Sequence, residues 1–397
     1  MTTRGSAGHL LPLAPIARAC AQEGHEVTVA AQRQHRANVE RAGLPFSPVG
    51  DPPEHEWMPL MDDFAQLDVD AAHARMIGDF FAGIDTRAGL PALLEIVERW
   101  RPDVIVRESW EFASTIAAEL HEIPLARVGL GLSSLEDLSA RLAAPFVDQA
   151  RETAGLPSDP AGDRLRDAPH LTFTPEDLDG PRAPRVHRFR TEAPAAVQPL
   201  PDWWPGNDGP LVYLSFGSVA AGAHLPYFPT LYRAAIDALA SLPVRLLVTI
   251  GEDRYPEELG EWPANVHVER WVPQDAVAPY AEAIVCHGGY GSTLGALAHG
   301  VPVVIMPLFS GDQWANADAV ARAGAGIALD RERGTRRVLG LPGAATIEEL
   351  PAAVGRALEE AAYRTAAERI ADAMSALPPV DAAVQVLATV AGRSKGA

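Results

Sequence analysis

The chain has 397 residues, of which 47% are hydrophobic and 21% charged, and its formal net charge is −19 at pH 7. A chain of this length is too long to fold around one ordinary hydrophobic core, so more than one domain is expected. The composition is that of a globular protein. The acidic balance argues against nucleic acid or an anionic membrane surface as partner, because both bind basic faces, but a phosphorylated small ligand is not excluded, since backbone N–H groups bind phosphate locally.

Helical and strand patterns alternate along the first half of the chain. Residues 11–22 have apolar residues at helical spacing, and Gly24 separates them from the buried strand pattern of residues 25–31. The same order recurs in residues 92–106 and 111–130. Such alternation predicts βαβ units and a mainly parallel sheet. Because only MTTR precedes the first loop, the first strand is either very short or begins late relative to related chains.

A change of composition separates the two halves. Prolines are frequent between residues 156 and 210, and we interpret residues 196–210 as a linker. The strand pattern restarts with LVYLSFGS at residues 211–218 and again alternates with helical patterns. We therefore predict two doubly wound, Rossmann-like α/β domains with parallel sheets, one over residues 1–195 and one over residues 211–375.

The loops expected at the carboxyl ends of the strands carry the chemically distinctive residues. His9 follows the first strand, and Glu108 follows RPDVIVR. In the second half, HGGYGST follows a buried strand and opens a helix, with glycines at positions 288, 289 and 291. Glycines let peptide N–H groups approach a ligand closely, and a helix N-terminus carries about half a positive charge. The pattern predicts an anion-binding site at the start of this helix.

Four ordered motifs connect the chain with a known family. WVPQ at 271–274, CHGGYGST at 286–293, GVPVVIMP at 300–307 and GDQWANA at 311–317 resemble the nucleotide-sugar signature of the family 1 glycosyltransferases. GHLLP at 8–12 resembles their acceptor-side loop, and the actinobacterial antibiotic and macrolide-type enzymes are the most similar in pattern.

The resemblance implies the GT-B fold, in which two Rossmann-like domains face a central cleft. It makes residues 1–195 the acceptor-binding domain and residues 211–375 the donor-binding domain, and it implies that the last helix, within residues 376–397, crosses back to the first domain.

The resemblance also implies how the donor nucleotide-sugar is bound. His287 and the N–H groups of Gly288 and Gly289 suit a diphosphate, and the flat face of Trp271 suits a pyrimidine base. Each residue has an ordinary structural alternative, such as a core tryptophan, a helix cap or a solvated turn. The donor-binding residues implied are Ser218, Trp271, Val272, Gln274, His287, Gly288, Gly289, Gly291, Ser292, Thr293, Asp312 and Gln313.

One departure from the family pattern bears on the donor. Plant members carry a glutamate, three residues after the serine of the motif, that holds both ribose hydroxyls, and here this position is Gly295. The family's asparagine before the serine is Gly291. A donor without a 2′-hydroxyl does not need the glutamate. We therefore favour a dTDP-sugar over a UDP-sugar.

His9 is the candidate general base, because the pKa of an imidazole lies near neutral pH. Glu108 occupies the position where family members often carry an aspartate, and a carboxylate there would orient the ring and stabilise the imidazolium. Alternatively, His9 binds the sugar or the backbone, and Glu108 is a solvated loop charge. The acceptor side is less defined: residues 55–85 mix aromatic and methionine side chains with acids, which suits a plastic apolar pocket or ordinary core.

We expect no metal and no cofactor beyond the nucleotide-sugar as co-substrate. Asp68-Val69-Asp70 and Asp177-Leu178-Asp179 match the DxD pattern of metal-dependent glycosyltransferases, but neither follows a strand beside the phosphate loop.

The two cysteines and the apolar segments bear on the cellular location. Cys20 and Cys286 lack metal or disulfide spacing, which predicts reduced thiols. No apolar run reaches the roughly 20 residues that span a bilayer, and His9, Pro12 and Pro15 interrupt the only segment that resembles a signal peptide. We expect a cytoplasmic protein without membrane or nucleic-acid partners.

The predicted function is inverting transfer of a sugar from a dTDP-sugar, with UDP-sugar as the second choice, to a hydroxyl of an apolar natural product such as a polyketide. The alternatives are a GT-B sugar-nucleotide epimerase, a lipid-carrier glycosyltransferase, an NAD(P)-dependent oxidoreductase and a non-catalytic helper protein. Residues 289–295 nearly fit a dinucleotide fingerprint, but Leu294 occupies its sixth position. The sequence leaves open whether the chain acts alone, as a homodimer or with an auxiliary protein.

Overall fold

The computed structural model describes residues 1–180, 185–191, 199–221, 225–330 and 336–394. The chain divides into two units. The first contains Met1–Asp63, Ala71–Glu192 and Ala376–Ala397, and the second contains Phe64–Asp70 and Ala193–Ser375. Of the predicted linker, residues 196–198 lie outside the described part, and residues 199–210 form neither helix nor strand.

The sheet of the first unit is parallel throughout. Its strands are β1 (Val29–Gln32), β2 (Phe46–Val49), β3 (Ile105–Glu108), β4 (Leu125–Val128), β5 (His170–Thr172) and β6 (Val186–Arg188). Thr2 forms parallel bridges with Ala30 of β1 and Arg107 of β3, and so joins the β1–β2 pair to the β3–β6 ladder. The N-terminal residues thus hold the position of a very short first strand between β1 and β3.

The helices of the first unit surround this sheet and leave their apolar faces in the core. In α2 (Leu13–Gln22), Leu13, Ile16 and Ala17 recur at helical spacing and are fully buried, and the helix ends before Gly24, whose φ of 85° closes the turn. The remaining helices are α1 (Ala7–Leu10), η1 (Arg33–His35), α3 (Arg36–Arg41), α4 (Glu54–Met61), α5 (Val69–Arg75), the π-helix η3 (Met76–Asp85), α6 (Thr86–Trp100), α7 (Ala113–Leu120), α8 (Ser133–Thr153), α9 (Asp163–Asp167), α10 (Glu176–Asp179) and α18 (Ala382–Ser394).

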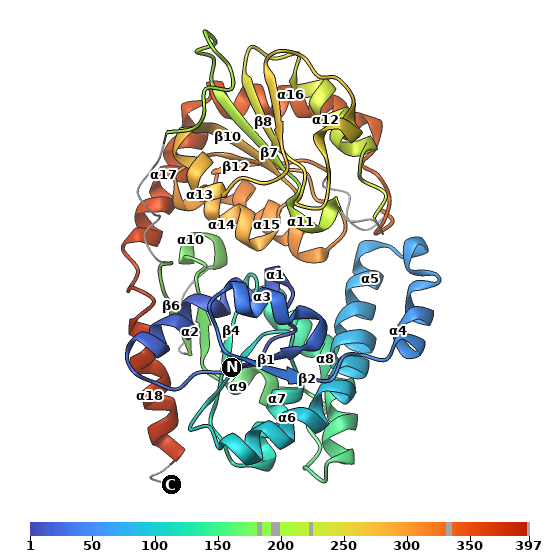
Figure 1. The fold of residues 1–397 in the computed structure, drawn as a ribbon, viewed down its shortest axis with the longest axis vertical. Coiled ribbons are helices and arrows are strands. Elements are labelled where there is room, and N and C mark those ends of the chain that lie inside the picture. The colour runs from blue at the N-terminus through green and yellow to red at the C-terminus, as the bar shows by residue number, and fades with distance from the viewer. Residues whose placement is uncertain (181–184, 192–198, 222–224, 331–335, 395–397) are drawn as a thin grey trace. The chain divides into compact units, whose positions relative to one another are not determined.

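The C-terminal segment belongs to the first unit. Arg190 forms a parallel bridge with Pro379, and its backbone N–H donates to the carbonyl of Pro378 at 2.9 Å. The last helix, α18, packs against α2 (Figure 1).

The second unit contains a six-stranded parallel sheet. Its strands are β7 (Leu211–Ser215), β8 (Arg245–Thr249), β9 (Val266–Glu269), β10 (Ala281–Cys286), β11 (Val303–Ile305) and β12 (Gly326–Ala328). Their order, β9-β8-β7-β10-β11-β12, is the 3-2-1-4-5-6 order of a doubly wound sheet. The central strands are buried on both faces, which explains their continuous apolar runs. In such a sheet the ligand crevice lies beyond the carboxyl ends of the first and fourth strands, here β7 and β10.

Helices α12 and α16 pack together, and their buried residues share one apolar cluster with β7 and β8 (Figure 1). The helices of this unit are η2 (Phe64–Gln66), α11 (Gly217–Ala220), α12 (Thr230–Leu239), η4 (Pro256–Leu259), α13 (Gln274–Val277), η5 (Ala278–Tyr280), α14 (Tyr290–Ala298), α15 (Gly311–Arg322), α16 (Ala344–Glu359) and α17 (Ala361–Ser375).

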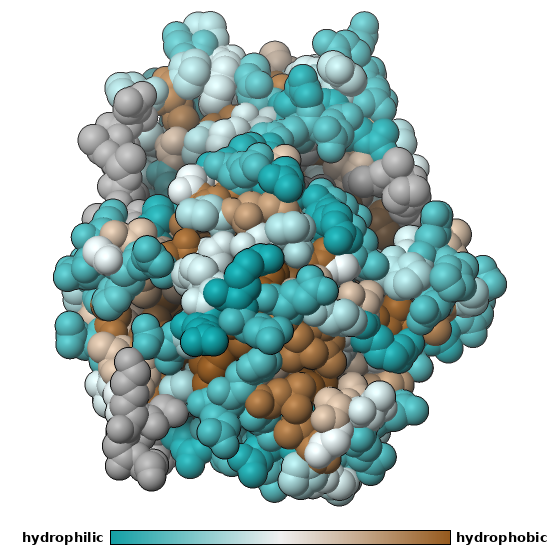
Figure 2. Space-filling view, turned by 60° about the horizontal axis from the view of Figure 1, so that its bottom comes forward, coloured by the Kyte–Doolittle hydropathy of each residue, from teal (hydrophilic) through white to brown (hydrophobic). Residues whose placement is uncertain are grey.

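The surface has the mixed character that the composition predicts. On the face drawn in Figure 2, hydrophilic residues predominate and hydrophobic residues gather in smaller areas between them. A surface of this kind is ordinary and does not by itself mark a binding site. Within the described ranges, none of the helices combines the length and the apolar character that crossing a bilayer requires.

Candidate active site

The first unit brings His9 and Glu108 together beside the short first strand. His9 lies in the single-turn helix α1, and Glu108 is the last residue of β3. The turn into α1 depends on Gly5, which has a φ of 88° and on which a Cβ would come within 2.7 Å of His35 Cβ. The Nδ1 atom of His9 lies 2.8 Å from Oε1 of Glu108, so the longer glutamate side chain reaches the ring.

The environment of Glu108 keeps its carboxyl ionised although the side chain is fully buried. The backbone N–H of Trp110 donates to Oε2 at 2.6 Å, and that of Arg4 donates to Oε1 at 3.3 Å. Burial alone would raise the pKa of Glu108, but His9, the Trp110 N–H and Arg4 together hold that pKa below its ordinary value. An ionised carboxylate only accepts hydrogen bonds, so Nδ1 of His9 is the donor and Nε2 is left to accept a proton.

Aromatic side chains fix the His9 ring from the sides. The ring lies edge-on to Phe81, with centroids 6.0 Å apart, and to Trp110, with centroids 5.6 Å apart. Phe81 is buried, whereas Phe80 is partly buried and packs against the same apolar cluster. Residues 55–85 are therefore partly core, and η3 supplies Phe81, one of the two aromatic rings beside His9.

The second unit places the glycine-rich loop at the carboxyl end of β10, next to β7. His287 and Gly288 connect β10 to Gly289, the N-cap of α14. Gly288 has a φ of 87°, and a Cβ on it would lie 2.7 Å from Ile305 Cγ2. A Cβ on Gly289 would lie 2.5 Å from His287 Nε2. Only glycine fits these positions, and the loop therefore presents bare backbone at the helix N-terminus.

His287 is enclosed by this loop. A Cβ on Gly217, the first residue of α11, would lie 2.6 Å from the Cε1 atom of His287. The His287 ring stacks on Phe309, with centroids 6.3 Å apart. Burial lowers the pKa of His287 to about 4, so the ring is neutral near pH 7. Its Nδ1 atom is buried and has no hydrogen-bond partner among the described residues.

The remaining donor-side residues fall into exposed and internal groups. Trp271 is 58% exposed, which rules out the alternative of a core tryptophan, and Val272 is half-buried. Gln274 begins α13, and its Nε2 donates to the carbonyl of Ser292 at 2.8 Å. A Cβ on Gly295 would lie 2.9 Å from that same Nε2, so the Gln274 amide fills the space beside the position of the family's glutamate.

Several predicted residues are turned inward. Thr293 is 2% exposed, and Gly291, between the N-cap and Thr293, is half-buried. Gln313 is also 2% exposed, and its Oε1 accepts from the N–H of Leu308 at 2.7 Å, so its amide oxygen shapes the loop after β11. Asp312 bonds to Ser310 at the start of α15. Ser218 belongs to α11, and its side chain lies outside the described part.

Sequence reasoning missed Asn316. Its Nδ2 donates to the carbonyl of Gly288 at 2.8 Å, and the side chain is buried, so it holds the backbone of the glycine loop. The available signal was its place within GDQWANA, one helical turn after Asp312. It also missed Arg4 and Asp85, described below.

The DxD patterns do not form an evident metal centre. Asp179 accepts from Arg188 Nη1 at 2.9 Å and from Ser133. In the part of the chain that the structure describes, no group of three or more His, Cys, Asp or Glu side chains is arranged to hold a metal ion.

Two doubly wound units, one with a histidine–carboxylate pair and one with a glycine loop at a helix N-terminus, agree with the transferase class that the motifs resemble. Comparison with known proteins gives the family. Residues 18–179 match the family model of the N-terminal domain, and residues 233–390 that of the C-terminal domain, of erythromycin biosynthesis protein CIII-like proteins.

Curated relatives span nearly the whole chain. The chain is 30% identical to 4′-demethylrebeccamycin synthase of Lentzea aerocolonigenes, with 97% of each chain covered. It is 30% identical to L-demethylnoviosyl transferase of Streptomyces niveus over 84% of this chain and 85% of the relative. The solved structure of glycosyltransferase VinC in complex with dTDP superimposes with a TM-score of 0.75 at 24% identity, covering 99% of both chains.

The chain belongs to the EryCIII-like family of antibiotic glycosyltransferases and has the GT-B fold. The fold class, the family and the enzyme class predicted from the sequence are confirmed.

Proposed function

We propose that the chain transfers a sugar, with inversion at the anomeric carbon, from a dTDP-sugar to a hydroxyl of an apolar natural product. The observation that carries this proposal is the contact of 2.8 Å between His9 Nδ1 and the buried, ionised Glu108. It is the arrangement that general-base catalysis needs, because the Nδ1 contact orients the ring and leaves Nε2 to face the acceptor.

In the proposed reaction, the acceptor hydroxyl gives its proton to Nε2 of His9 while its oxygen attacks the anomeric carbon. The bond between that carbon and the diphosphate oxygen breaks, and the nucleoside diphosphate leaves with the electron pair. Glu108 stabilises the imidazolium that forms. Attack opposite to the leaving group inverts the configuration.

On the donor side, the backbone N–H groups that open α14 and the neutral ring of His287 would bind the diphosphate. The helix N-terminus offsets part of the charge that develops on the leaving group, which is the task that a cation performs in metal-dependent enzymes. We propose that no metal is needed. The exposed face of Trp271 would stack on the base.

The preference for dTDP rests on Gly295, which offers the ribose no carboxylate. Two structural neighbours support it. VinC was solved with dTDP, and spinosyn rhamnosyltransferase SpnG, with a TM-score of 0.77, was solved with thymidine diphosphate. The names of the relatives, which refer to rebeccamycin and noviosyl transfer, support a natural-product acceptor.

The decisive variant is His9→Ala, assayed with a panel of dTDP- and UDP-sugars and natural-product acceptors. We expect kcat to fall about 10²–10⁴-fold, the range that proton transfer by a positioned side chain contributes. The affinity for dTDP, measured by calorimetry, should stay within about twofold, because His9 belongs to the acceptor-binding unit.

The matched control is His121→Ala, which removes an exposed histidine at the end of α7 in the same unit. Activity of His9→Ala within a few-fold of the wild type would remove His9 as the base. Conversion of the sugar-nucleotide without any acceptor would favour an epimerase instead.

A further inference from the structure

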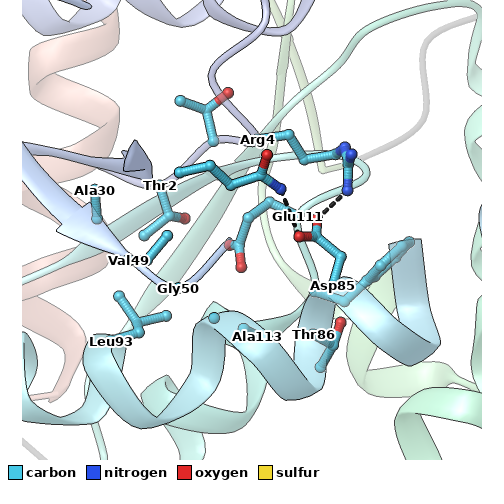
Figure 3. Close-up of a pocket in the computed structure, with 14 residues that line it drawn as sticks. Thr2, Arg4, Ala30, Val49, Gly50, Asp85, Thr86, Leu93, Glu111 and Ala113 are labelled. Carbon is cyan, nitrogen blue, oxygen red and sulfur yellow. Dashed lines mark hydrogen bonds and ion pairs between the residues drawn. The ribbon is translucent and has the colours of Figure 1, made fainter. Parts of the chain in front are cut away.

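Arg4 is held on several sides next to the proposed base. Its guanidinium carbon lies 3.8 Å from the ring centroid of Phe81 and 4.9 Å from that of Phe80. Its Nη1 forms an ion pair with Asp85, and the two side chains are only 10% and 11% exposed. Figure 3 shows Asp85, the last residue of η3, directed toward Arg4, and Gln32 donates to the second oxygen of Asp85.

The groups around the Arg4 side chain come from one π-helical segment. A π-helix is bonded from residue i to residue i+5, and Phe80, Phe81 and Asp85 of η3 all contact Arg4. The buried hydroxyl of Thr86 donates to the carbonyl of Phe81 at 2.9 Å and closes the last π-turn. Short π-segments often occur at functional sites.

The same arginine is bonded to the proposed catalytic pair through its backbone. The N–H of Arg4 donates at 3.3 Å to Oε1 of Glu108, the oxygen that also accepts from His9 Nδ1. Arg4 and His9 lie on one short segment, so the anchor of the Arg4 side chain limits where the loop can place the His9 ring.

We propose that Arg4 and Asp85 are positioning residues, whose ion pair anchors the loop from Arg4 to His9 so that His9 and Glu108 stay in hydrogen-bond contact. The inference rests on the proposed function for its catalytic consequence. A displacement of about 1 Å at a reacting group can lower a rate 10²-fold, so a side chain that touches no substrate can control turnover.

Arg4 can be replaced without leaving an isolated buried charge. Burial raises the pKa of Asp85, and Arg4 and Gln32 oppose that effect. When Arg4 is replaced, the carboxyl therefore takes up a proton instead of remaining charged and unpaired. We expect Arg4→Met and Asp85→Asn to fold.

The first test reads the hydrogen bond directly, by proton NMR of the full chain. A strongly hydrogen-bonded imidazole N–H gives a downfield signal, which is assigned to His9 by its loss in His9→Gln and Glu108→Gln. We expect the signal to broaden or vanish in Arg4→Met and Asp85→Asn. It should persist in Arg87→Met, the matched control, which removes an exposed arginine ion pair, with Glu56, from the same region. An unchanged signal in both pair variants would overturn the proposal.

The second test is a double-mutant cycle in turnover. We expect Arg4→Met to lower kcat about tenfold or more, with the acceptor KM nearly unchanged. In the Glu108→Gln background, Arg4→Met should lower kcat less than about twofold, because the contact between His9 and Glu108 that Arg4 supports is already lost. Equal losses in both backgrounds, or a rise in KM at constant kcat, would assign Arg4 to acceptor binding and refute the positioning role.

The two tests separate this inference from the proposed function. If His9→Ala retains activity while the NMR signal still depends on Arg4 and Asp85, the base assignment fails and the positioning pair stands. If Arg4→Met does not fold, Arg4→Lys replaces it: lysine keeps the charge but lacks the planar group that stacks on Phe81 and pairs with the carboxylate. An unaltered signal and kcat in Arg4→Lys and Asp85→Asn would then refute the proposal.

Discussion

The pKa of His287 gives a quantitative test of the donor loop. Burial lowers this pKa from 6.5 to about 4. A histidine that is neutral in the native state and free to protonate in the unfolded state makes stability fall as the pH drops below 6.5. At 1.36 kcal/mol per pKa unit, the effect approaches about 3.4 kcal/mol well below pH 4, and at pH 5 it is about 2 kcal/mol.

The assay combines two measurements on the wild type and on His287→Asn. NMR titration of the histidine C2 protons should give one signal with a midpoint near pH 4 that is missing in the variant. Hydrogen exchange of the β10 amides reports the unfolding free energy of the second unit. Between pH 7 and pH 5, the wild type should lose about 2 kcal/mol more than the variant, and other buried histidines such as His170 cancel in the difference.

Addition of dTDP sharpens the test. A bound diphosphate favours the charged ring, because an opposite charge within a few ångströms stabilises it, so the His287 midpoint should move to higher pH. Nucleotide binding should then take up a fraction of a proton near pH 5. A midpoint near 6.5 in the free protein would refute the enclosed, neutral ring, and a midpoint that dTDP leaves unchanged would refute its contact with the diphosphate.

Three further outcomes are expected on the donor side. Gly295→Glu should raise the use of UDP-sugar relative to dTDP-sugar once the Gln274 amide moves aside, and an unchanged ratio of kcat/KM values would remove the reason for preferring dTDP. Trp271→Ala should weaken dTDP binding by about 1–3 kcal/mol in calorimetry but change stability by less than about 0.5 kcal/mol, because the ring is exposed. Gly288→Ala should lower stability by more than about 1 kcal/mol, because its φ is 87° and a Cβ would clash with Ile305, and a variant with wild-type Tm and dTDP affinity would contradict this packing.

The features that the sequence predicts well are those with a local signature. Alternating helical and apolar strand patterns predict parallel sheets, and ligand loops follow the carboxyl ends of strands, so His9, Glu108 and the glycine loop could be placed in advance. Trp271 is identified through its motif, and its exposure excludes a core tryptophan, whereas its stacking on the base stays a prediction.

The features that the sequence does not predict depend on contacts between residues far apart in the chain, or on backbone conformations that have no characteristic sequence pattern. Arg4 and Asp85 are separated by 81 positions, and no spacing rule pairs them. The spacing of apolar residues in a π-helix is hard to distinguish from that in an α-helix. The π-helical form of η3 could therefore not be predicted from the sequence. The sequence left two alternatives for the first strand, and the structure shows the very short one, because Thr2 pairs as a single residue between two neighbours. Gln313 points inward because the N–H of Leu308 needs an acceptor.

In the proposed mechanism the two units give opposite tasks to a histidine. His9 follows the first strand of its sheet, and His287 follows β10, the fourth strand of the other sheet. In each sheet the distinctive loops follow the first and fourth strands, which are neighbours. In the first unit the residue that faces the histidine is Glu108, an ionised carboxylate that stabilises the charged ring. In the second unit it is Gly217, which brings no charge and lets the backbone enclose His287. A ring that a carboxylate orients suits proton transfer from an attacking hydroxyl, and a ring that stays neutral suits donation to a phosphate. The single substitution Glu108→Gly should therefore abolish turnover while leaving nucleotide binding intact.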